Sequence, residues 1–145
     1  MPSSYTASLI GGIKKAEELD RKVEITYAIT AHTDGTVTAI STDTDTKNGR
    51  TYTSYIRKMS LKVVEAFPTA LGTAPDPADV TVKQNLLDLL GGYGVNLISA
   101  TATKSTSPRI DGQPATYPIN GALTIGIANQ TTNAATFTIR LTFVS

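Results

Sequence analysis

Few residues in the chain are able to do chemistry, and His32 is the one around which a catalytic or metal site would have to be built. It is the only histidine, and the chain has no cysteine. Nucleophilic triads and zinc sites normally depend on such side chains. Because His32 lies just before Asp34-Gly35, a pair that favours hairpin loops, we expect it to be an exposed loop residue without a catalytic role.

A second candidate is the acidic run Asp43-Thr44-Asp45-Thr46-Lys47-Asn48-Gly49, whose first carboxylates are spaced as in a calcium-binding loop. Lys47 occupies the third ligand position, however, and Ser54 stands where the closing bidentate carboxylate is needed. The run therefore predicts a hairpin tip around Asn48-Gly49 and no metal site.

The remaining motifs also lack catalytic partners. Glu17, Glu18 and Asp20 are interspersed with basic residues, as on a solvated surface, and no G-x-S-x-G nucleophile motif occurs. The run Gly91-Gly92-Tyr93-Gly94 lacks the Lys-Ser/Thr of a phosphate-binding loop and is explained by a turn. We therefore predict that the chain is not an enzyme and that it binds no cofactor.

Alternation of apolar and polar residues with a period of two indicates the elements that would carry these groups. It is strongest in residues 22–30, where Val23, Ile25, Tyr27 and Ile29 would share one face of a strand. The chain also has 24 threonines, whose β-branched side chains favour strands. The same alternation recurs at Met59-Leu61-Val63, Val80-Val82, Leu123-Ile125-Ile127 and Phe137-Ile139-Leu141-Phe143.

Turn signals separate these segments and favour antiparallel pairing. Asp34-Gly35, Asn48-Gly49, Asp111-Gly112 and Asn120-Gly121 are hairpin-type pairs, while Pro68, Pro75 and Pro77 mark an irregular connection between two sheets. We predict an all-β fold, an antiparallel β-sandwich or jelly roll of about seven or eight strands. Weaker strand candidates are residues 36–41, 51–56 and 96–103, and residues 86–90 could form a short helix or a strand end.

The N-terminal segment is the ambiguous part of this organisation. Leu9, Ile10 and Ile13 have a helical spacing, but Gly11-Gly12 disfavours a helix. We expect residues 1–21 to form an extended arm or a short helix, followed by a single β-sandwich domain over residues 22–145.

Charge and hydropathy exclude several classes of partner. The formal net charge is +1, which gives no general attraction to nucleic acid or to anionic membranes. The apolar runs are far shorter than the roughly 20 residues that cross a bilayer, and the first residues do not resemble a targeting signal. After Asp111, Arg140 is the only charged residue, so we expect the C-terminal third to pack against a partner.

Four runs of the chain carry a resemblance to a known class of proteins. They are Ala78-Asp79-Val80-Thr81-Val82, Asp88-Leu89-Leu90-Gly91-Gly92-Tyr93-Gly94, Ser99-Ala100-Thr101-Ala102-Thr103 and Tyr117-Pro118-Ile119-Asn120-Gly121-Ala122-Leu123-Thr124-Ile125. With these runs the chain resembles small virion proteins of tailed bacteriophages, and the resemblance extends over residues 22–145. It implies a capsid decoration or cement protein that binds the major capsid protein and copies of itself, as a homo-oligomer such as a trimer. Such a protein is made in the bacterial host cytoplasm and resides on the capsid surface of the virion.

Two other roles remain open, a ring component of the neck or tail and a carbohydrate-binding module for host adsorption. In the second, tyrosines that flank turns would stack on sugars. We expect partner binding by residues of the N-terminal segment and by these tyrosines, and deletion of residues 2–15 to weaken attachment without disturbing the fold. The candidates are Tyr5, Leu9, Ile10, Ile13, Tyr52, Tyr55, Tyr93 and Tyr117.

Overall fold

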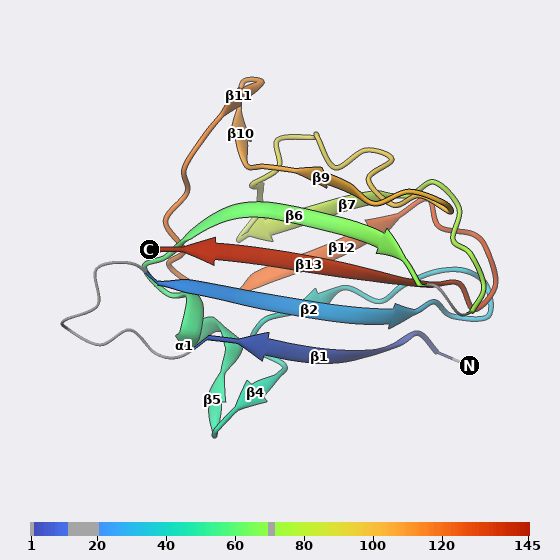
Figure 1. Cartoon of the computed structure of the whole chain (residues 1–145), viewed down its shortest axis with the longest axis horizontal. Helices are drawn as coiled ribbons and strands as arrows, with labels where there is room; N and C mark the ends of the chain where they lie inside the picture. Colours follow the sequence, from blue (N-terminus) through green and yellow to red (C-terminus); the bar gives the residue numbers. More distant parts are fainter. Residues whose placement is uncertain (1, 12–20, 70–71) are drawn as a thin grey trace.

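The computed structural model describes residues 2–11, 21–69 and 72–145, and these form two antiparallel sheets in separate layers (Figure 1). The first sheet has the order β1 (Ser4–Ile10), β2 (Lys22–Thr30), β13 (Thr136–Val144), β6 (Ser60–Pro68) and β9 (Lys104–Thr106). The second has the order β3 (Ile40–Ser41), β12 (Leu123–Ala128), β7 (Asp79–Gln84) and β8 (Leu87–Asp88). The predicted all-β, antiparallel fold is confirmed, while its jelly-roll form stays a prediction.

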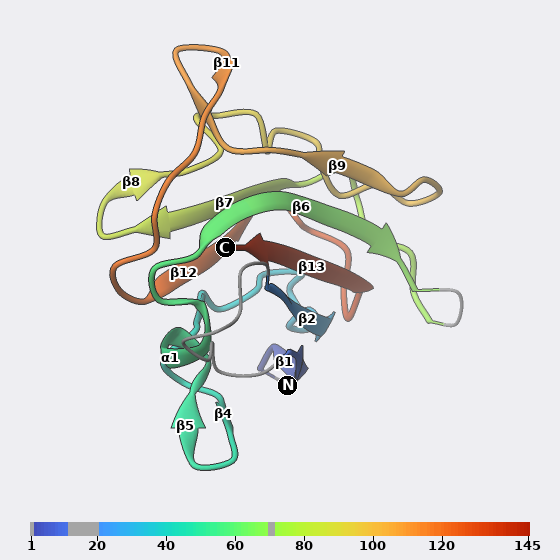
Figure 2. The ribbon, with the colours of Figure 1, turned by 60° about the vertical axis from the view of Figure 1, so that its left-hand side comes forward.

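Two small hairpins and one short helix complete the molecule. The hairpins are β4 (Thr46–Lys47) with β5 (Arg50–Thr51) and β10 (Arg109–Ile110) with β11 (Gln113–Pro114). They project from the two sheets (Figure 2). The helix α1 (Tyr52–Ile56) directly follows β5.

A single apolar core lies between the two sheets. β13 is central, because it pairs along its whole length with β2 and along most of it with β6. Its apolar row and that of β2 follow the predicted alternation and are buried. β7 and β12 contribute Val80, Val82, Leu123 and Ile125 from the second sheet. The buried row of β13 consists of Phe137, Ile139, Leu141 and Phe143.

The N-terminal residues are part of the sandwich, so the expectation of a separate arm or helix is wrong for residues 4–10. β1 pairs with β2 over seven residues, from Ser4 opposite Thr30 to Ile10 opposite Glu24. Tyr5, Ala7 and Leu9 alternate toward the core, which is a strand pattern rather than a helical one. Deleting residues 2–15 would therefore remove an edge strand and damage the fold.

In β6 the predicted alternation is interrupted. Thr142 of β13 faces Val63, but the next residue, Phe143, faces Leu61, so Lys62 is skipped in a β-bulge. A bulge inserts one residue and reverses which face the following side chains occupy. As a result Val64, and not the predicted Val63, is fully buried.

Residues 51–56, a weak strand candidate, instead form α1. Tyr52, Tyr55 and Ile56 are spaced three and four residues apart, so one face of a helix carries all three into the core. Of the other weak candidates, residues 36–41 contain only the short β3 and residues 96–103 contain no strand. Residues 86–90 contain β8.

Two of the four hairpin-type pairs form two-residue loops. Asn48-Gly49 and Asp111-Gly112 have positive φ at both positions and close the β4–β5 and β10–β11 hairpins. Asp34-Gly35 forms a turn, and Asn120-Gly121 has no positive φ. The proline-marked connection from β6 to β7 crosses between the sheets, as predicted.

Residues 89–98, which we call the edge segment, run beside β7 without forming a regular strand. The amide of Leu89 donates to Val82 O at 2.8 Å, the amide of Val80 donates to Gly94 O at 2.9 Å, and Ile98 bridges to Ala78. A Cβ atom on Gly94 would lie 1.8 Å from Val80 O, so only glycine permits this approach.

We expect Gly94→Ala to lower the free energy of unfolding by at least about 2 kcal/mol, because the added methyl forces the edge segment away from β7. Chemical denaturation followed by circular dichroism measures this change. Gly121→Ala is the matched control, since a Cβ there meets nothing within 4 Å. Equal effects of the two substitutions would contradict the close packing at Gly94.

Candidate interaction surface

Large apolar side chains are exposed mainly along one edge of the second sheet. Among the described residues, five of the six exposed large hydrophobics lie between positions 86 and 110, and the sixth is Ile10. Single exposed apolar residues are ordinary, whereas several along one edge make that edge a candidate interaction surface. We call this group the apolar edge, and it consists of Leu86 (93% exposed), Leu87 (53%), Tyr93 (49%), Val95 (63%) and Ile110 (49%).

The turn after β7 and the edge segment position most of this surface. Asn85 has a φ of 56° and reverses the chain, so that Leu86 and Leu87 project from the turn. The Asp88 carboxylate then holds the following residues in place. Its Oδ1 accepts hydrogen bonds from the amides of Val82 and Leu90, and its Oδ2 accepts one from Gly92, each at 3.1 Å.

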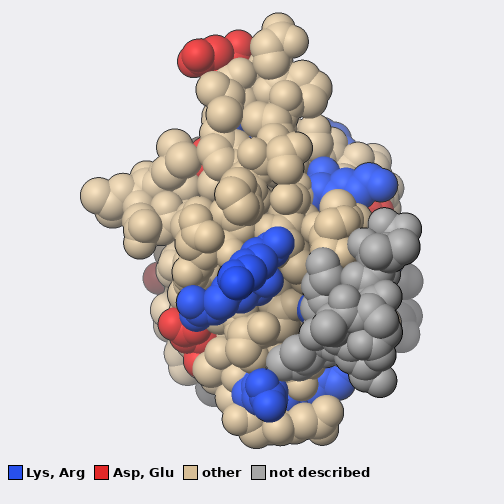
Figure 3. All heavy atoms as spheres, turned by 90° about the vertical axis from the view of Figure 1, so that its left-hand side faces the viewer, with Lys and Arg blue, Asp and Glu red and all other residues tan. Residues whose placement is uncertain are grey.

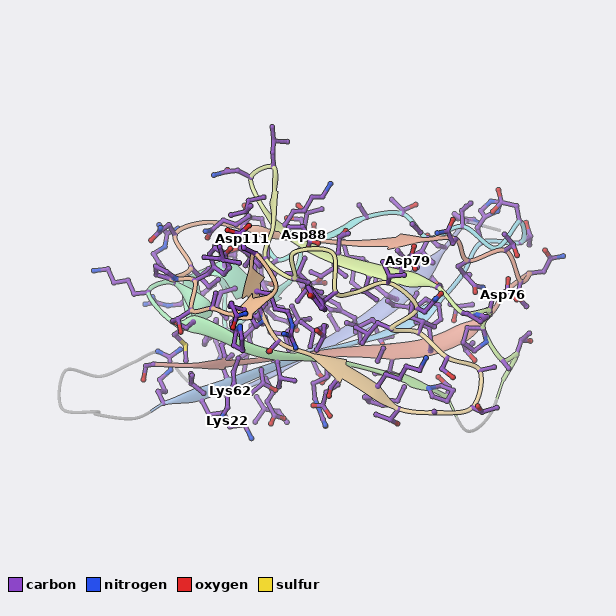
Figure 4. The ribbon with its side chains drawn as sticks, turned by 90° about the horizontal axis from the view of Figure 1, so that it is seen from above. Lys22, Lys62, Asp76, Asp79, Asp88 and Asp111 are labelled. Carbon is purple, nitrogen blue, oxygen red and sulfur yellow. The ribbon has the colours of Figure 1, made fainter. Side chains whose placement is uncertain are left out.

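The β10–β11 hairpin packs beside this segment and adds Ile110. The Arg109 amide donates to Leu89 O at 3.0 Å, and the Arg109 guanidinium carbon lies 4.4 Å from the centre of the Tyr93 ring. This cation–π contact fixes the ring at the surface. Figure 4 labels Asp88, which holds the edge segment, and Asp111, at the tip of the β10–β11 hairpin.

The chemistry of the apolar edge suits contact with another protein. It presents aliphatic side chains together with a tyrosine stacked on an arginine, and tyrosine and arginine are enriched where proteins meet. Asp111, at the tip of the β10–β11 hairpin, is the exposed charged residue closest in sequence to Ile110.

Three of the predicted partner-binding residues are in the core and are corrected here. Leu9, Tyr52 and Tyr55 are 6%, 4% and 3% exposed. The Tyr55 hydroxyl donates to Lys47 O at 2.9 Å, which anchors the β4–β5 hairpin. These side chains contribute to folding and cannot reach a partner, and Tyr52 and Tyr55 cannot stack on a sugar.

Tyr5 is half-buried and also has a structural partner. Its ring meets Tyr27 edge-to-face, with centroids 5.7 Å apart, and its hydroxyl donates to Asp45 Oδ2 at 2.9 Å. Burial, followed by the hydrogen bond to Asp45, raises the pKa of Tyr5 to about 12. Tyr5 therefore remains a protonated donor that connects β1 to the residues before β4.

The other predicted residues have different environments. Tyr93 belongs to the apolar edge, whereas Ile10 is exposed on β1, distant in sequence from it. Tyr117 is half-buried, and its hydroxyl lies 3.4 Å from Arg109 O, beneath the β10–β11 hairpin. Ile13 lies outside the described residues. Of the residues of the apolar edge, the sequence predicted Tyr93 but not Leu86, Leu87, Val95 or Ile110. The only sign of these four in the sequence is that each is an apolar residue beside a turn.

Three surface grooves are lined by few titratable side chains of the described part of the chain. The largest of the three, about 470 Å³, lies between β6 and residues 107–116, and Lys62 is the charged side chain among its described lining residues. The described residues that line the three grooves include no histidine, aspartate or glutamate. His32 is in a turn, where its Nδ1 accepts a hydrogen bond from the Asp34 amide at 3.1 Å.

Within the described ranges the chain has neither a metal-binding cluster of side chains nor a membrane-spanning helix. No group of three or more histidine, cysteine, aspartate or glutamate side chains there could hold a metal ion. Within residues 2–11, 21–69 and 72–145, no helix has the length and apolar character needed to cross a membrane.

Comparison with known proteins provides no further assignment. No protein-family model, curated protein sequence or solved structure matches the chain.

At the end of the sandwich opposite α1, the loop of residues 129–132 is held by Asp76. The Thr131 amide donates to Asp76 Oδ2 at 3.0 Å and the Thr132 hydroxyl donates to Oδ1 at 2.6 Å. Hydrogen bonds from the Thr131 and Thr132 side chains, with the Thr131 amide, lower the pKa of the Asp76 carboxyl.

We expect Asp88→Ala to loosen the edge segment, because three amides lose their acceptor. The free energy of unfolding should fall by about 1–3 kcal/mol, and hydrogen exchange at the amides of Leu90 and Gly92 should accelerate. Asp43→Ala removes an exposed carboxylate without a hydrogen bond of this kind and should change neither quantity. Unchanged exchange in Asp88→Ala would contradict the role assigned to Asp88.

Asp76 should make the free energy of unfolding depend on pH. Because its pKa is lower in the folded than in the unfolded chain, its stabilisation is present above about pH 4 and is lost as the pH falls through the folded value. Urea unfolding at neutral pH should show Asp76→Asn to be less stable than the parent, and near pH 2 the difference should shrink. Asp43→Asn provides the control, and a pH-independent difference for Asp76→Asn would refute this linkage.

Proposed function

We propose that the chain is a non-enzymatic structural protein of a phage virion, a capsid decoration or cement protein that binds and stabilises the lattice of the major capsid protein. The apolar edge carries this proposal. Five large hydrophobic side chains project there from β7–β8, the edge segment and the β10–β11 hairpin. They would lose their exposure to water in a contact with a lattice protein.

The energetics favour such a contact on a repeating surface. Full burial of one aliphatic or aromatic side chain contributes roughly 1.5–3 kcal/mol, and much of this is offset by the loss of freedom on binding. A shell presents the same site many times, and a bound oligomer engages several sites together. A modest apolar contact is therefore sufficient for stable decoration.

The grooves and the sequence resemblance support the non-enzymatic and virion parts of the proposal. The described lining of three surface grooves includes no aspartate, glutamate or histidine side chain, the groups that general acid–base catalysis most often requires. Residues 78–82 and 88–94, which carry part of the resemblance to small virion proteins, form β7, β8 and the edge segment. Burial of Tyr52 and Tyr55 leaves the carbohydrate-binding alternative with two of its four stacking candidates.

Substitutions in the apolar edge test this assignment. Leu86→Ser together with Val95→Ser should weaken binding to phage heads stripped of their minor proteins by at least about fivefold, the effect of losing about 1 kcal/mol. Co-sedimentation over a series of protein concentrations gives the dissociation constant.

Ile10→Ser is the matched control, since Ile10 is 67% exposed but lies on β1. Binding that falls with Ile10→Ser and is unchanged in the double variant would place the contact at the N-terminal strand. Absence of any binding by the parent protein would refute the decoration role.

A further inference from the structure

One end of the sandwich carries a group of three carboxylates, Asp34, Asp76 and Asp79, which we call the acidic end. All three lie against the loop of residues 129–132. Asp76 accepts from Thr131 and Thr132, and Asp79 Oδ2 accepts from Asn129 Nδ2 at 2.6 Å. Asp34 precedes Gly35, whose Cα packs so closely on Thr131 that a Cβ atom would lie 2.2 Å from its carbonyl carbon.

The acidic end keeps a net negative charge. Hydrogen bonds to Thr36 lower the pKa of Asp34, as those from Thr131 and Thr132 lower that of Asp76, so both remain ionised at neutral pH. Lys104 is the nearby cation, since its Nζ donates to Asn96 O while the Asn96 amide donates to Asp79. Among the residues that the structure describes, these three carboxylates and the Lys104 ammonium leave an excess of two negative charges.

The opposite end carries Lys22, Arg57, Lys58 and Lys62, which we call the basic end. All four side chains are exposed. Lys22 and Ser60 face Val144 from the two sides of β13, and Lys62 follows on β6. Glu24 pairs with Lys22 at 2.8 Å, so these five described residues together have an excess of three positive charges. Figure 3 looks onto this end and shows Lys and Arg side chains on it, with acidic side chains toward its margins.

The length of the central strands separates the two groups. β13 runs from Thr136 at the acidic end to Val144 at the basic end, a distance of about 27–30 Å for nine extended residues. Between them, Arg140 is neutralised by Glu65, with Nη2 2.9 Å from Oε1. Figure 4 shows Asp76 and Asp79 toward one end of the molecule and Lys22 and Lys62 toward the other, where Asp88 and Asp111 also lie. Among the described residues, the two named groups therefore place opposite charge at opposite ends of the strands.

We infer that copies of the chain contact one another head to tail, with the acidic end of one copy against the basic end of the next. Charge complementarity identifies a second copy of the chain as the binding partner, because the two ends of the chain carry opposite net charges. Such a contact joins two different surfaces, so it propagates into a closed ring or an open filament. The inference goes beyond the proposed function and concerns the isolated protein, so either can fail without the other.

Sedimentation velocity of the purified chain tests the contact. Species larger than a monomer should form at about 0.1 M NaCl and dissociate at about 1 M, since the Debye length falls from about 10 Å to about 3 Å. A protein that is monomeric at both salt concentrations would refute the contact, and the basic end would then be assigned to a foreign acidic partner.

Two charge-changed variants make the test specific. Arg57→Glu with Lys62→Glu makes both ends acidic, whereas Thr33→Lys, Asp34→Lys and Asn133→Lys together make both ends basic. Each variant alone should associate at least about tenfold more weakly than the parent, and an equimolar mixture should regain association. Circular dichroism verifies that both are folded.

Arg50→Glu with Lys83→Glu is the control, because it changes the net charge equally through two exposed residues that are not among the four of the basic end. The control should associate like the parent. Association that is reduced equally in the control, or that is not regained in the mixture, would overturn the head-to-tail contact.

Discussion

The whole structure depends on the burial of β13 between β2 and β6. Phe137, Ile139, Leu141 and Phe143 are completely buried, and each such side chain contributes roughly 1.5–3 kcal/mol when removed from water. Because β13 is hydrogen-bonded on both sides, it aligns the first sheet and provides the surface on which β7 and β12 pack. β7 in turn carries the edge segment, and the two ends of β13 define the acidic and basic ends. The surfaces proposed for recognition are therefore consequences of one buried strand.

Much of the fold could be predicted because apolar and polar residues alternate with a period of two in its central strands. β2, β12 and β13 each place one apolar row against the core, and burial of a face enforces that pattern. Prediction failed where a tertiary contact overrides local spacing. The bulge at Lys62 shifts β6, and α1 forms because Tyr52, Tyr55 and Ile56 fill space beneath the sandwich. β1 was missed because Leu9 and Ile10 also match a helical spacing.

The candidate site was far less predictable than the fold. Tyrosines near turns were expected at the surface, but only Tyr93 belongs to the apolar edge. Tyr55 is buried because its hydroxyl reaches Lys47 O, and Tyr5 is half-buried because it reaches Asp45. A sequence does not specify such long-range partners. The apolar edge forms where the β7–β8 hairpin and the segment after it meet the β10–β11 hairpin, about twenty residues further along the chain. Alternation and turn signals do not encode such a contact. The charge polarity likewise appears only when strand directions are known.

The most direct measurement of the central claim is the number of copies that a phage head binds at saturation. Heads stripped of minor proteins are incubated with excess purified chain, separated by sedimentation, and the bound protein is quantified against the major capsid protein. A decoration protein predicts hundreds of saturable copies, in a fixed ratio to the lattice. A dozen or fewer copies would instead assign the chain to the neck or tail, and no bound copies would contradict a role in the virion shell.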